Sequence, residues 1–388
     1  MRASRIIGLI LIALALTAAI SAANLPLLGR DFILFWTSGR AIQQGYSPYD
    51  LEFQARTQQA HGWDVKRELM PFNPYSYPPW LAIAIWPLAW LPYGTAFDVW
   101  LAFSLVAFAL ALVALLKAAS RSVTSGRLLI VMLFGFTFAP MLNGLTVGQL
   151  NAALFAILAG MIWGLDTRRE RFAGICMGLL SIKPHVGLII AVVVSAGLVA
   201  RRRWQPLLWA GVTVAICAGV SFVVAPTWLG DLLASFQRFT DLTGWTFPLN
   251  GFQDNPTAYA ALRVSAESNP AVLGLVVVSL VCLAGVIVYR ARRGQSSPSM
   301  QWLSAAGCVA VFLITPYTRA YDLTFLLWPL MYFAFSDEIV IPVWLRRSLG
   351  LLLYMMPIVL LLLGGQGVSN FVTVYVLALA LLVPPHAD

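Results

Sequence analysis

Long apolar stretches separated by short polar loops recur along almost the whole 388-residue chain. A helix of about 20 apolar residues can cross a bilayer, because its backbone hydrogen bonds are satisfied internally. The pattern therefore predicts an all-α polytopic integral membrane protein, a bundle of about 10–12 transmembrane helices. The candidate spans are residues 6–28, 97–116, 128–145, 149–165, 205–225, 271–289, 301–315, 322–336, 348–363 and 371–385.

Two further apolar regions carry helix-breaking residues. Residues 77–92 contain Pro78, Pro79, Pro87 and Pro92, which predicts a broken or re-entrant segment rather than a span. Residues 172–200 are interrupted by Lys183-Pro184-His185, which predicts two half-length helices that meet at the proline. Non-helical backbone at membrane depth is tolerated only where it is buried in protein or lines a cavity.

Arginines gather in the loops between apolar runs and give the predicted topology. Under the positive-inside rule these loops and the N-terminus are cytoplasmic, which places the two longest polar stretches, residues 24–76 and 226–270, outside. The net charge of +9 is thus explained by loop placement, which argues against nucleic-acid binding. The arginine groups are Arg168, Arg169 and Arg171; Arg201, Arg202 and Arg203; Arg290, Arg292 and Arg293; and Arg346 and Arg347.

The N-terminal segment has two interpretations. Arg2 and Arg5 precede an apolar run that ends at Ser21-Ala22-Ala23, which is the pattern of a signal peptide. We favour an uncleaved first span, because the polar stretch after it contains candidate functional residues. Residues 1–388 are then expected to form a single transmembrane domain.

Asp31 stands where the first span leaves the membrane, and apolar residues follow it at 32, 33, 35 and 36. The spacing predicts a helix that lies along the membrane interface within the first outer loop. Asp31 is then either the cap of that helix or an active carboxylate.

Lys183 lies in the middle of an apolar run, where a charge is costly unless it meets an anion or lines water. We expect Lys183 to bind an anion, with His185 in the same break; snorkelling of the lysine is the alternative. Gln149 and Asn151, also predicted on the outer side, either contribute to this site or hydrogen-bond between helices.

Two more outer-facing groups are candidates. Tyr77 belongs to an aromatic segment that is either an interfacial aromatic belt or a wall for a sugar or polyprenyl chain. Arg319 departs from the positive-inside trend, so it either serves an anionic partner or pairs with Asp322. The sequence contains no P-loop, HExxH or GxSxG motif.

One carboxylate with several cations suits sugar transfer from a polyprenyl phosphate. Cationic side chains stabilise the departing lipid phosphate, and one base deprotonates the acceptor hydroxyl on the opposite face of the sugar. Such a reaction inverts the anomeric centre and requires no metal or other cofactor. The expected partners are the donor, a lipid or glycan acceptor and membrane lipid.

Segments spread from residue 31 to about 330 match a known family in order and spacing: residues 31–36, 45–50, 77–79, 87–88, 148–151, Gly174, Gly178, Lys183-Pro184, Pro316 and Tyr321-Asp322. Through these segments the chain resembles the GT-C glycosyltransferases, and within them family 87, which uses polyprenyl-phosphate sugars. The resemblance implies a GT-C-like bundle, a catalytic aspartate at Asp31 and a lysine directed to the donor phosphate at Lys183. In place of the serine-proline and histidine-rich loop frequent in that family, this sequence has Thr315-Pro316 and Arg319.

The sequence thus predicts a multi-pass enzyme of the plasma (inner) membrane, with its N-terminus in the cytoplasm and its active site on the outer, periplasmic side. The expected donor sugar is mannose or a related hexose or pentose. The alternative is a transporter or flippase of lipid-linked saccharides. We disfavour it because such carriers usually contain internal repeats, and we find none in the sequence.

Overall fold

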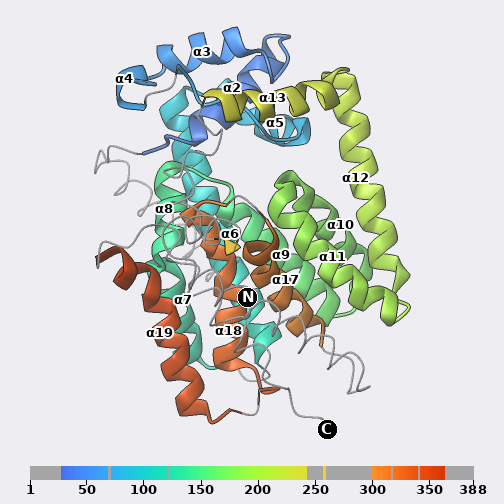
Figure 1. The fold of residues 1–388 in the computed structure, drawn as a ribbon. Helices are drawn as coiled ribbons and strands as arrows, with labels where there is room; N and C mark the ends of the chain where they lie inside the picture. The colour runs from blue at the N-terminus through green and yellow to red at the C-terminus, as the bar shows by residue number, and fades with distance from the viewer. Residues whose placement is uncertain are drawn as a thin grey trace, which may run out of the picture. The chain divides into compact units, whose positions relative to one another are not determined.

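The computed structural model describes residues 28–68, 71–120, 123–242, 257–258, 299–315, 318–339 and 341–362. The predicted spans 271–289 and 371–385, and 6–28 apart from Leu28, lie outside these ranges. Within them every regular element is helical (Figure 1). The α-helices are α2 (Phe32–Gln43), α3 (Leu51–Ala60), α4 (Val65–Glu68), α5 (Pro79–Ile85), α6 (Tyr93–Ala119), α7 (Ser125–Thr137), α8 (Ala139–Val147), α9 (Asn151–Asp166), α10 (Glu170–Leu179), α11 (Pro184–Ala200), α12 (Trp204–Val224), α13 (Trp228–Leu242), α17 (Met300–Ile314), α18 (Leu327–Phe335) and α19 (Val343–Leu362).

Three short 3₁₀ helices complete the described elements: η1 (Trp86–Trp90), η2 (Leu180–Ile182) and η3 (Ala320–Leu326). Among the described helices, α6 and α12 are each long and apolar enough to cross a membrane. Helices α7 and α8, taken together as one span that is bent by 56°, are also long and apolar enough to cross a membrane. The chain is therefore an all-α membrane protein, and its total number of spans stays a prediction.

Two of the predicted spans have a different local structure from a straight helix, and two predicted breaks are present. The segment 128–145 divides into α7 and α8, because Pro140 in the first turn of α8 cannot continue the hydrogen bonding of α7. The segment 322–336 begins as η3 and continues as α18. The predicted breaks at 77–92 and at Lys183-Pro184 are confirmed, by α5 with η1 and by η2 with α11.

Contacts within the chain define two compact units. The first contains residues 1–110, 143–154 and 211–246, and the second contains residues 111–142, 155–210 and 247–388. The expectation of a single transmembrane domain stays a prediction.

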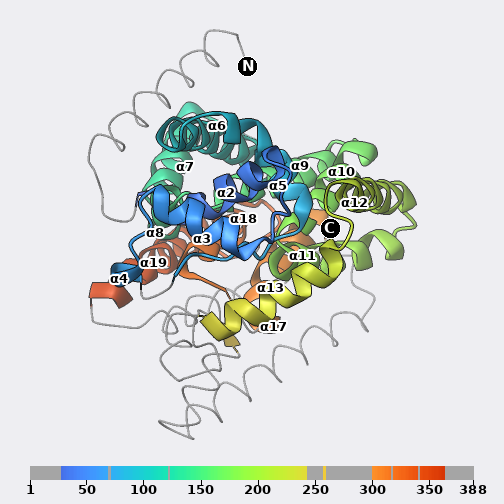
Figure 2. The same cartoon turned by 90° about the horizontal axis from the view of Figure 1, so that it is seen from above.

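Helix α2 forms the centre of the first unit. It packs against α3, α5 and η1, and Figure 2 shows it beside α3 and α5. Phe32 to Trp36 are all buried, so the helix has almost no exposed apolar face. The helix predicted after Asp31 is confirmed, and its packing is that of a core helix; its placement at a membrane interface stays a prediction.

Buried glutamines of α3 hold the segment that leads into α5. Gln58 donates to the Asn73 carbonyl at 2.8 Å and accepts from the Asn73 backbone N–H at 2.8 Å. Gln54 likewise accepts from the backbone N–H of Tyr75 at 2.8 Å. These bonds satisfy backbone groups of a buried loop that has no secondary structure of its own.

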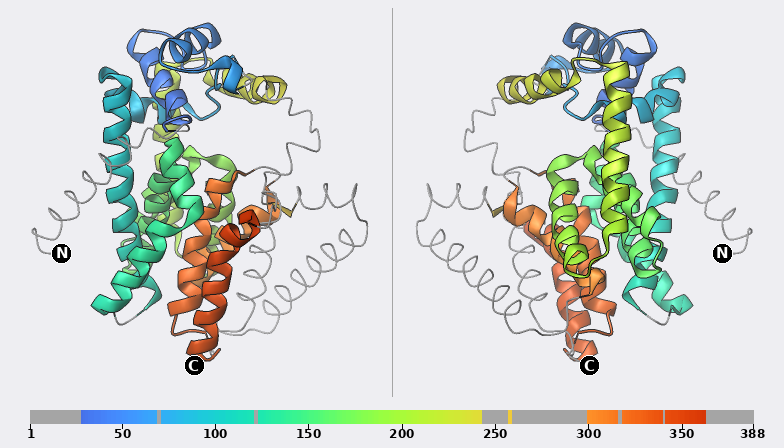
Figure 3. Two further views of the ribbon diagram at one scale, coloured as in Figure 1. Left: turned by 90° about the vertical axis from the view of Figure 1, so that its left-hand side faces the viewer. Right: turned by 90° about the vertical axis from the view of Figure 1, so that its right-hand side faces the viewer.

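The second unit is built around the contact of α11 with α17. Gly307 of α17 permits close packing, because a Cβ atom there would lie 3.2 Å from the Ile190 Cα atom. Helix α18 packs between α17 and α19, and Figure 3 shows α18 beside α19. The buried Trp328 indole donates to Ser304 Oγ at 2.9 Å, which joins α18 to α17.

Candidate functional site

Asp31 is held at the start of α2 by backbone hydrogen bonds to a distant part of the chain. The Gly29 N–H donates to the Thr146 carbonyl at 2.9 Å, and the Asp31 N–H donates to the Val147 carbonyl at 2.8 Å. The turn before α2 is therefore fixed against the end of α8. Both segments that make this contact lie within the first unit.

Glycine is required at Gly148, where these two segments meet. Its φ of +77° is in the left-handed region, and a Cβ atom would lie 2.6 Å from the Phe32 Cβ atom. The Trp100 indole donates to the Gly148 carbonyl at 3.1 Å and fixes the turn from the other side. The Gly-Gln-Leu-Asn segment is thus positioned by backbone contacts around α2.

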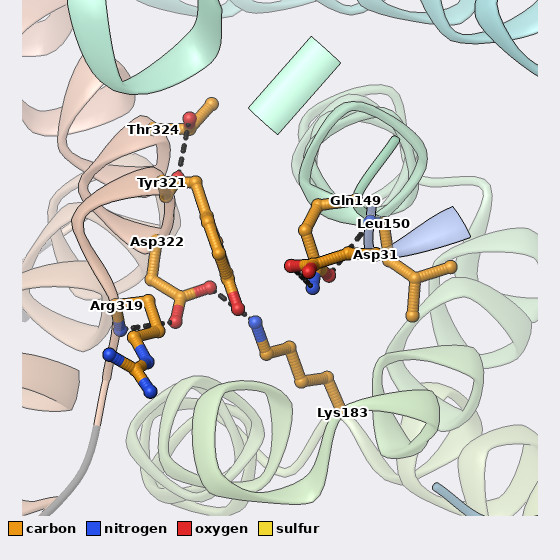
Figure 4. A network of polar contacts seen from close by, with 8 residues as sticks. All are labelled: Asp31, Gln149, Leu150, Lys183, Arg319, Tyr321, Asp322 and Thr324. Atoms are coloured by element: carbon orange, nitrogen blue, oxygen red, sulfur yellow. Dashed lines mark hydrogen bonds and ion pairs between the residues drawn. The ribbon is translucent and has the colours of Figure 1, made fainter. Parts of the chain in front are cut away.

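The side chain of Gln149 orients the Asp31 carboxylate. Gln149 is 3% exposed, and its Nε2 atom donates to Asp31 Oδ2 at 2.7 Å (Figure 4). Asp31 makes no side-chain hydrogen bond to the first turn of α2, so the interpretation of Asp31 as a side-chain cap is wrong. A carboxylate held by a neutral amide remains an acceptor and can take a proton from a hydroxyl.

The side chain of Asn151 packs against α8. It lies at the start of α9, is 1% exposed, and its amide lies against Gly144, where a Cβ atom would collide with it. Of the two predicted amides in this segment, Gln149 contacts Asp31, and Asn151 packs on the last turn of α8.

Tyr77 belongs to an aromatic cluster next to α2. Its ring packs edge-on against Phe35, one helical turn after Asp31, with centroids 5.2 Å apart. The Tyr49 hydroxyl donates to the Tyr77 carbonyl at 2.7 Å. Burial, and then the charge of Asp231, raises the pKa of Tyr49, so this phenol stays protonated as a donor. Tyr75 is fully buried and structural, whereas Tyr77 is partly exposed.

In the second unit, Lys183 and Asp322 form a buried ion pair. Lys183 Nζ donates to Asp322 Oδ1, and the side chains are 3% and 1% exposed (Figure 4). Lys183 occupies the non-helical junction between η2 and α11, with φ −122° and ψ 83°. The proline after it disfavours helical geometry at this position, so the backbone break directs the lysine into the protein.

Residues around Asp322 complete this polar cluster. Asp322 Oδ2 accepts from the Arg319 backbone N–H at 3.0 Å, and the Tyr321 ring centroid lies 4.9 Å from Lys183 Nζ. The Asp322 carboxylate thus receives the Lys183 ammonium on one oxygen and the Arg319 backbone N–H on the other. His185 follows in the first turn of α11.

Two buried hydroxyls, each within four residues of Lys183 or Asp322 in the sequence, were not anticipated as candidates. Ser181 Oγ lies in η2, two residues before Lys183, and Thr318 Oγ1 lies four residues before Asp322. Both atoms are buried and have no hydrogen-bond partner among the described atoms. Unsatisfied buried hydroxyls are costly unless a ligand or water completes them, so both are candidate donors to a bound anion. Serine and threonine are too common in loops to have been selected by pattern alone.

The family of the chain follows from comparison with known proteins. The model of glycosyltransferase family 87 matches residues 75–316, which is more than half of the chain. The chain belongs to glycosyltransferase family 87. The matched part of this family-87 protein contains Tyr77, Gln149, Asn151, Lys183 and His185, whereas Asp31 lies before it and Arg319 and Asp322 lie after it. No curated protein matches the chain.

The candidate residues of this family-87 glycosyltransferase thus form two polar centres, one in each unit. The first consists of Asp31 and Gln149 with the Tyr77 aromatic cluster nearby. The second consists of Lys183 and Asp322 with Tyr321, His185 and the Arg319 backbone. The first offers an oriented proton acceptor, and the second offers a buried cation.

Proposed function

We propose that this family-87 glycosyltransferase transfers a sugar, mannose or a related hexose or pentose, from a polyprenyl-phosphate donor to an acceptor hydroxyl, with inversion. The observation that supports it best is the buried Lys183, held by Asp322 at a backbone break and accompanied by unsatisfied hydroxyls. A buried lysine in an apolar environment is retained for an anion or a water-filled path.

Lys183 is proposed to bind the donor phosphate. As the bond between the anomeric carbon and the phosphate oxygen breaks, negative charge grows on that oxygen, and a cation in a low-dielectric site stabilises it. Asp322 holds the Lys183 side chain in place while the site is empty. The Ser181 and Thr318 hydroxyls, His185 and the Arg319 guanidinium are proposed to donate further hydrogen bonds to the phosphate oxygens.

Asp31 is proposed as the general base. The acceptor hydroxyl attacks the anomeric carbon from the face opposite the phosphate, its proton moves to the Asp31 carboxylate, and the bonding electrons leave with the phosphate. Gln149 keeps one carboxylate oxygen engaged and so directs the group toward the acceptor. Tyr77 is proposed to pack against the sugar or the polyprenyl chain, and Asn151 to maintain the turn that carries Gln149.

The proposed location is the plasma (inner) membrane, with the N-terminus in the cytoplasm and transfer on the outer side. This topology is supported by the arginine-rich loops. A donor whose polyprenyl tail lies in the bilayer explains why the enzyme is embedded there. The positive charge for the leaving group comes from side chains, so no metal is assigned a step.

The proposal is tested by incubating membranes that contain the protein with polyprenyl-phosphate sugars labelled in the sugar. Transfer of the label to an acceptor, with release of polyprenyl phosphate and an inverted linkage, supports the proposal. Movement of intact donor across the membrane without breakage of the glycosidic bond would support the lipid-linked-saccharide flippase instead. Loss of transfer in Lys183→Met, with unchanged amounts of protein in the membrane, would support the role of the lysine.

A further inference from the structure

Two helices of the second unit end in the same unusual way. After α9, the Arg169 N–H donates to the Gly164 carbonyl at 2.8 Å, and Arg168 has a φ of +59°. After α11, the Arg203 N–H donates to the Leu198 carbonyl at 2.9 Å, and Arg202 has a φ of +54°. Both are Schellman turns, in which the left-handed position is normally glycine.

Arginine at the left-handed position of both turns requires an explanation. A side chain there is strained relative to glycine, which adopts this conformation freely. The positive-inside rule explains arginines anywhere in these loops, yet it does not explain why the two strained positions carry them. Positive charge at a helix C-terminus is favourable, but Arg169 and Arg201 beside the same turns already supply it.

Neighbouring arginines in these turns are engaged by the protein. Arg203 donates to Glu170 at 2.9 Å and to the Leu165 carbonyl at 3.0 Å, which ties the second turn to the first. Arg169 lies over the Trp163 ring, 4.7 Å from its centroid, and Arg201 donates to the Gly197 carbonyl at 3.0 Å.

Arg168 and Arg202 differ from these neighbouring arginines in their contacts. Both are exposed, and within the described part of the chain neither side chain makes a hydrogen bond, ion pair or ring contact. Burial, followed by the nearby charges of Arg203 and Arg168, lowers the pKa of Arg201. The two turns therefore form one basic cluster, in which the guanidinium groups of Arg168 and Arg202 have no protein acceptor among the described residues.

The surroundings indicate a lipid head group as the acceptor. The second turn leads directly into α12, which is apolar and long enough to span a membrane. In its first turns Trp204 is 58% exposed and Leu208 is 64% exposed. An exposed tryptophan beside arginines at the end of a span is typical of the level at which phospholipid head groups lie. Guanidinium groups bind phosphate oxygens in a bidentate geometry.

We propose that the turns at Arg168 and Arg202 bind the phosphate group of an anionic phospholipid. The two arginines supply the phosphate contacts, and the apolar start of α12 supports the acyl chains. This inference concerns a lipid that is neither donor nor acceptor, and it does not depend on the proposed sugar transfer.

The test uses the full-length protein in a neutral detergent, with thermal unfolding followed during titration with phosphatidylglycerol, phosphatidylcholine or inorganic phosphate. We expect phosphatidylglycerol to raise the thermal-unfolding midpoint of the wild-type protein, and phosphatidylcholine and inorganic phosphate to leave it unchanged. In Arg168→Gly/Arg202→Gly the apparent affinity for phosphatidylglycerol should fall about tenfold or more, because two of the charges at the membrane surface are lost. Without lipid, the thermal-unfolding midpoint of this variant should be at least as high as that of the wild type, because glycine relieves the strain in both turns.

A matched control separates this site from general charge attraction. Lys117→Gln/Arg347→Gln removes two exposed charges elsewhere in the same unit and should keep the phosphatidylglycerol response. The inference would be overturned if the control lost the response equally, if the glycine variant retained it, or if inorganic phosphate alone reproduced it. Lower lipid-free midpoints in both the glycine variant and Arg168→Asn/Arg202→Asn would show a purely structural role and would also overturn it.

Discussion

Lys183 forms a buried ion pair with Asp322, which lies 139 positions further along the chain. The pair joins the backbone break before α11 to the first turn of η3. Because neither charge is exposed to water, each depends on the other for its stability, while the lysine is also the cation that we assign to the donor phosphate.

The ion pair therefore has a structural role that can be separated from its proposed chemical role. Lys183→Met alone should lower the free energy of unfolding by roughly 3–5 kcal/mol, because a buried carboxylate loses its partner. In Lys183→Met/Asp322→Leu most of that stability should return, since neither charge remains. Transfer activity should stay absent in both variants. Thermal unfolding and a transfer assay on the same preparations measure the two effects, and recovery of activity in the double variant would exclude Lys183 from the reaction.

Gln149 is predicted to act by orienting Asp31. Gln149→Leu should lower kcat about ten- to hundredfold, because the carboxylate loses the hydrogen bond that directs it. The KM for the donor should change little. Gln237→Ala, an exposed glutamine of the same unit, serves as the control and should be neutral. Unchanged kcat in Gln149→Leu would contradict the orienting role.

Gly148 should tolerate no side chain. Gly148→Ala should cost about 2–4 kcal/mol, from left-handed strain and from the collision with Phe32. Gly45 also has a positive φ, +80°, but nothing lies within 4 Å of a Cβ atom there, so Gly45→Ala should cost only the strain, about 1 kcal/mol. The difference between the two variants in unfolding free energy isolates the contact of Gly148 with α2. Equal costs would show that this contact is unimportant.

Removal of divalent metal should leave the reaction intact. The proposal assigns the stabilisation of the leaving phosphate to Lys183 and neighbouring donors, so transfer in the presence of EDTA should equal that in its absence. The measurement is the initial rate of label transfer in washed membranes. A loss of activity that added Mg²⁺ or Mn²⁺ restores would refute the assignment of charge stabilisation to side chains alone.

The sequence was sufficient for features that depend on local chemistry. The break at Lys183-Pro184 was predictable, because proline disfavours a helical residue before it and a lysine is costly in an apolar run. The helix after Asp31 was predictable from the spacing of the apolar residues at 32, 33, 35 and 36. The bend between α7 and α8 had a signal in Pro140 that the hydrophobic pattern concealed.

Long-range partners could not be predicted in this way. Asp322 as the partner of Lys183, and Gln149 as the partner of Asp31, depend on contacts between segments more than 100 residues apart. The Ser181 and Thr318 hydroxyls become candidates only because the structure leaves them buried without a partner. Polarity and spacing identify costly side chains, whereas packing determines which groups satisfy them.

The proposed role of Asp31 as the base is the claim on which the reaction scheme depends most. The most direct test is the initial rate of sugar transfer from a polyprenyl-phosphate donor by Asp31→Asn, at matched amounts of membrane protein. Asparagine preserves the shape of the side chain but cannot accept the acceptor proton, so the rate should fall by at least about a hundredfold. A rate for Asp31→Asn equal to that of the wild-type protein would contradict the account.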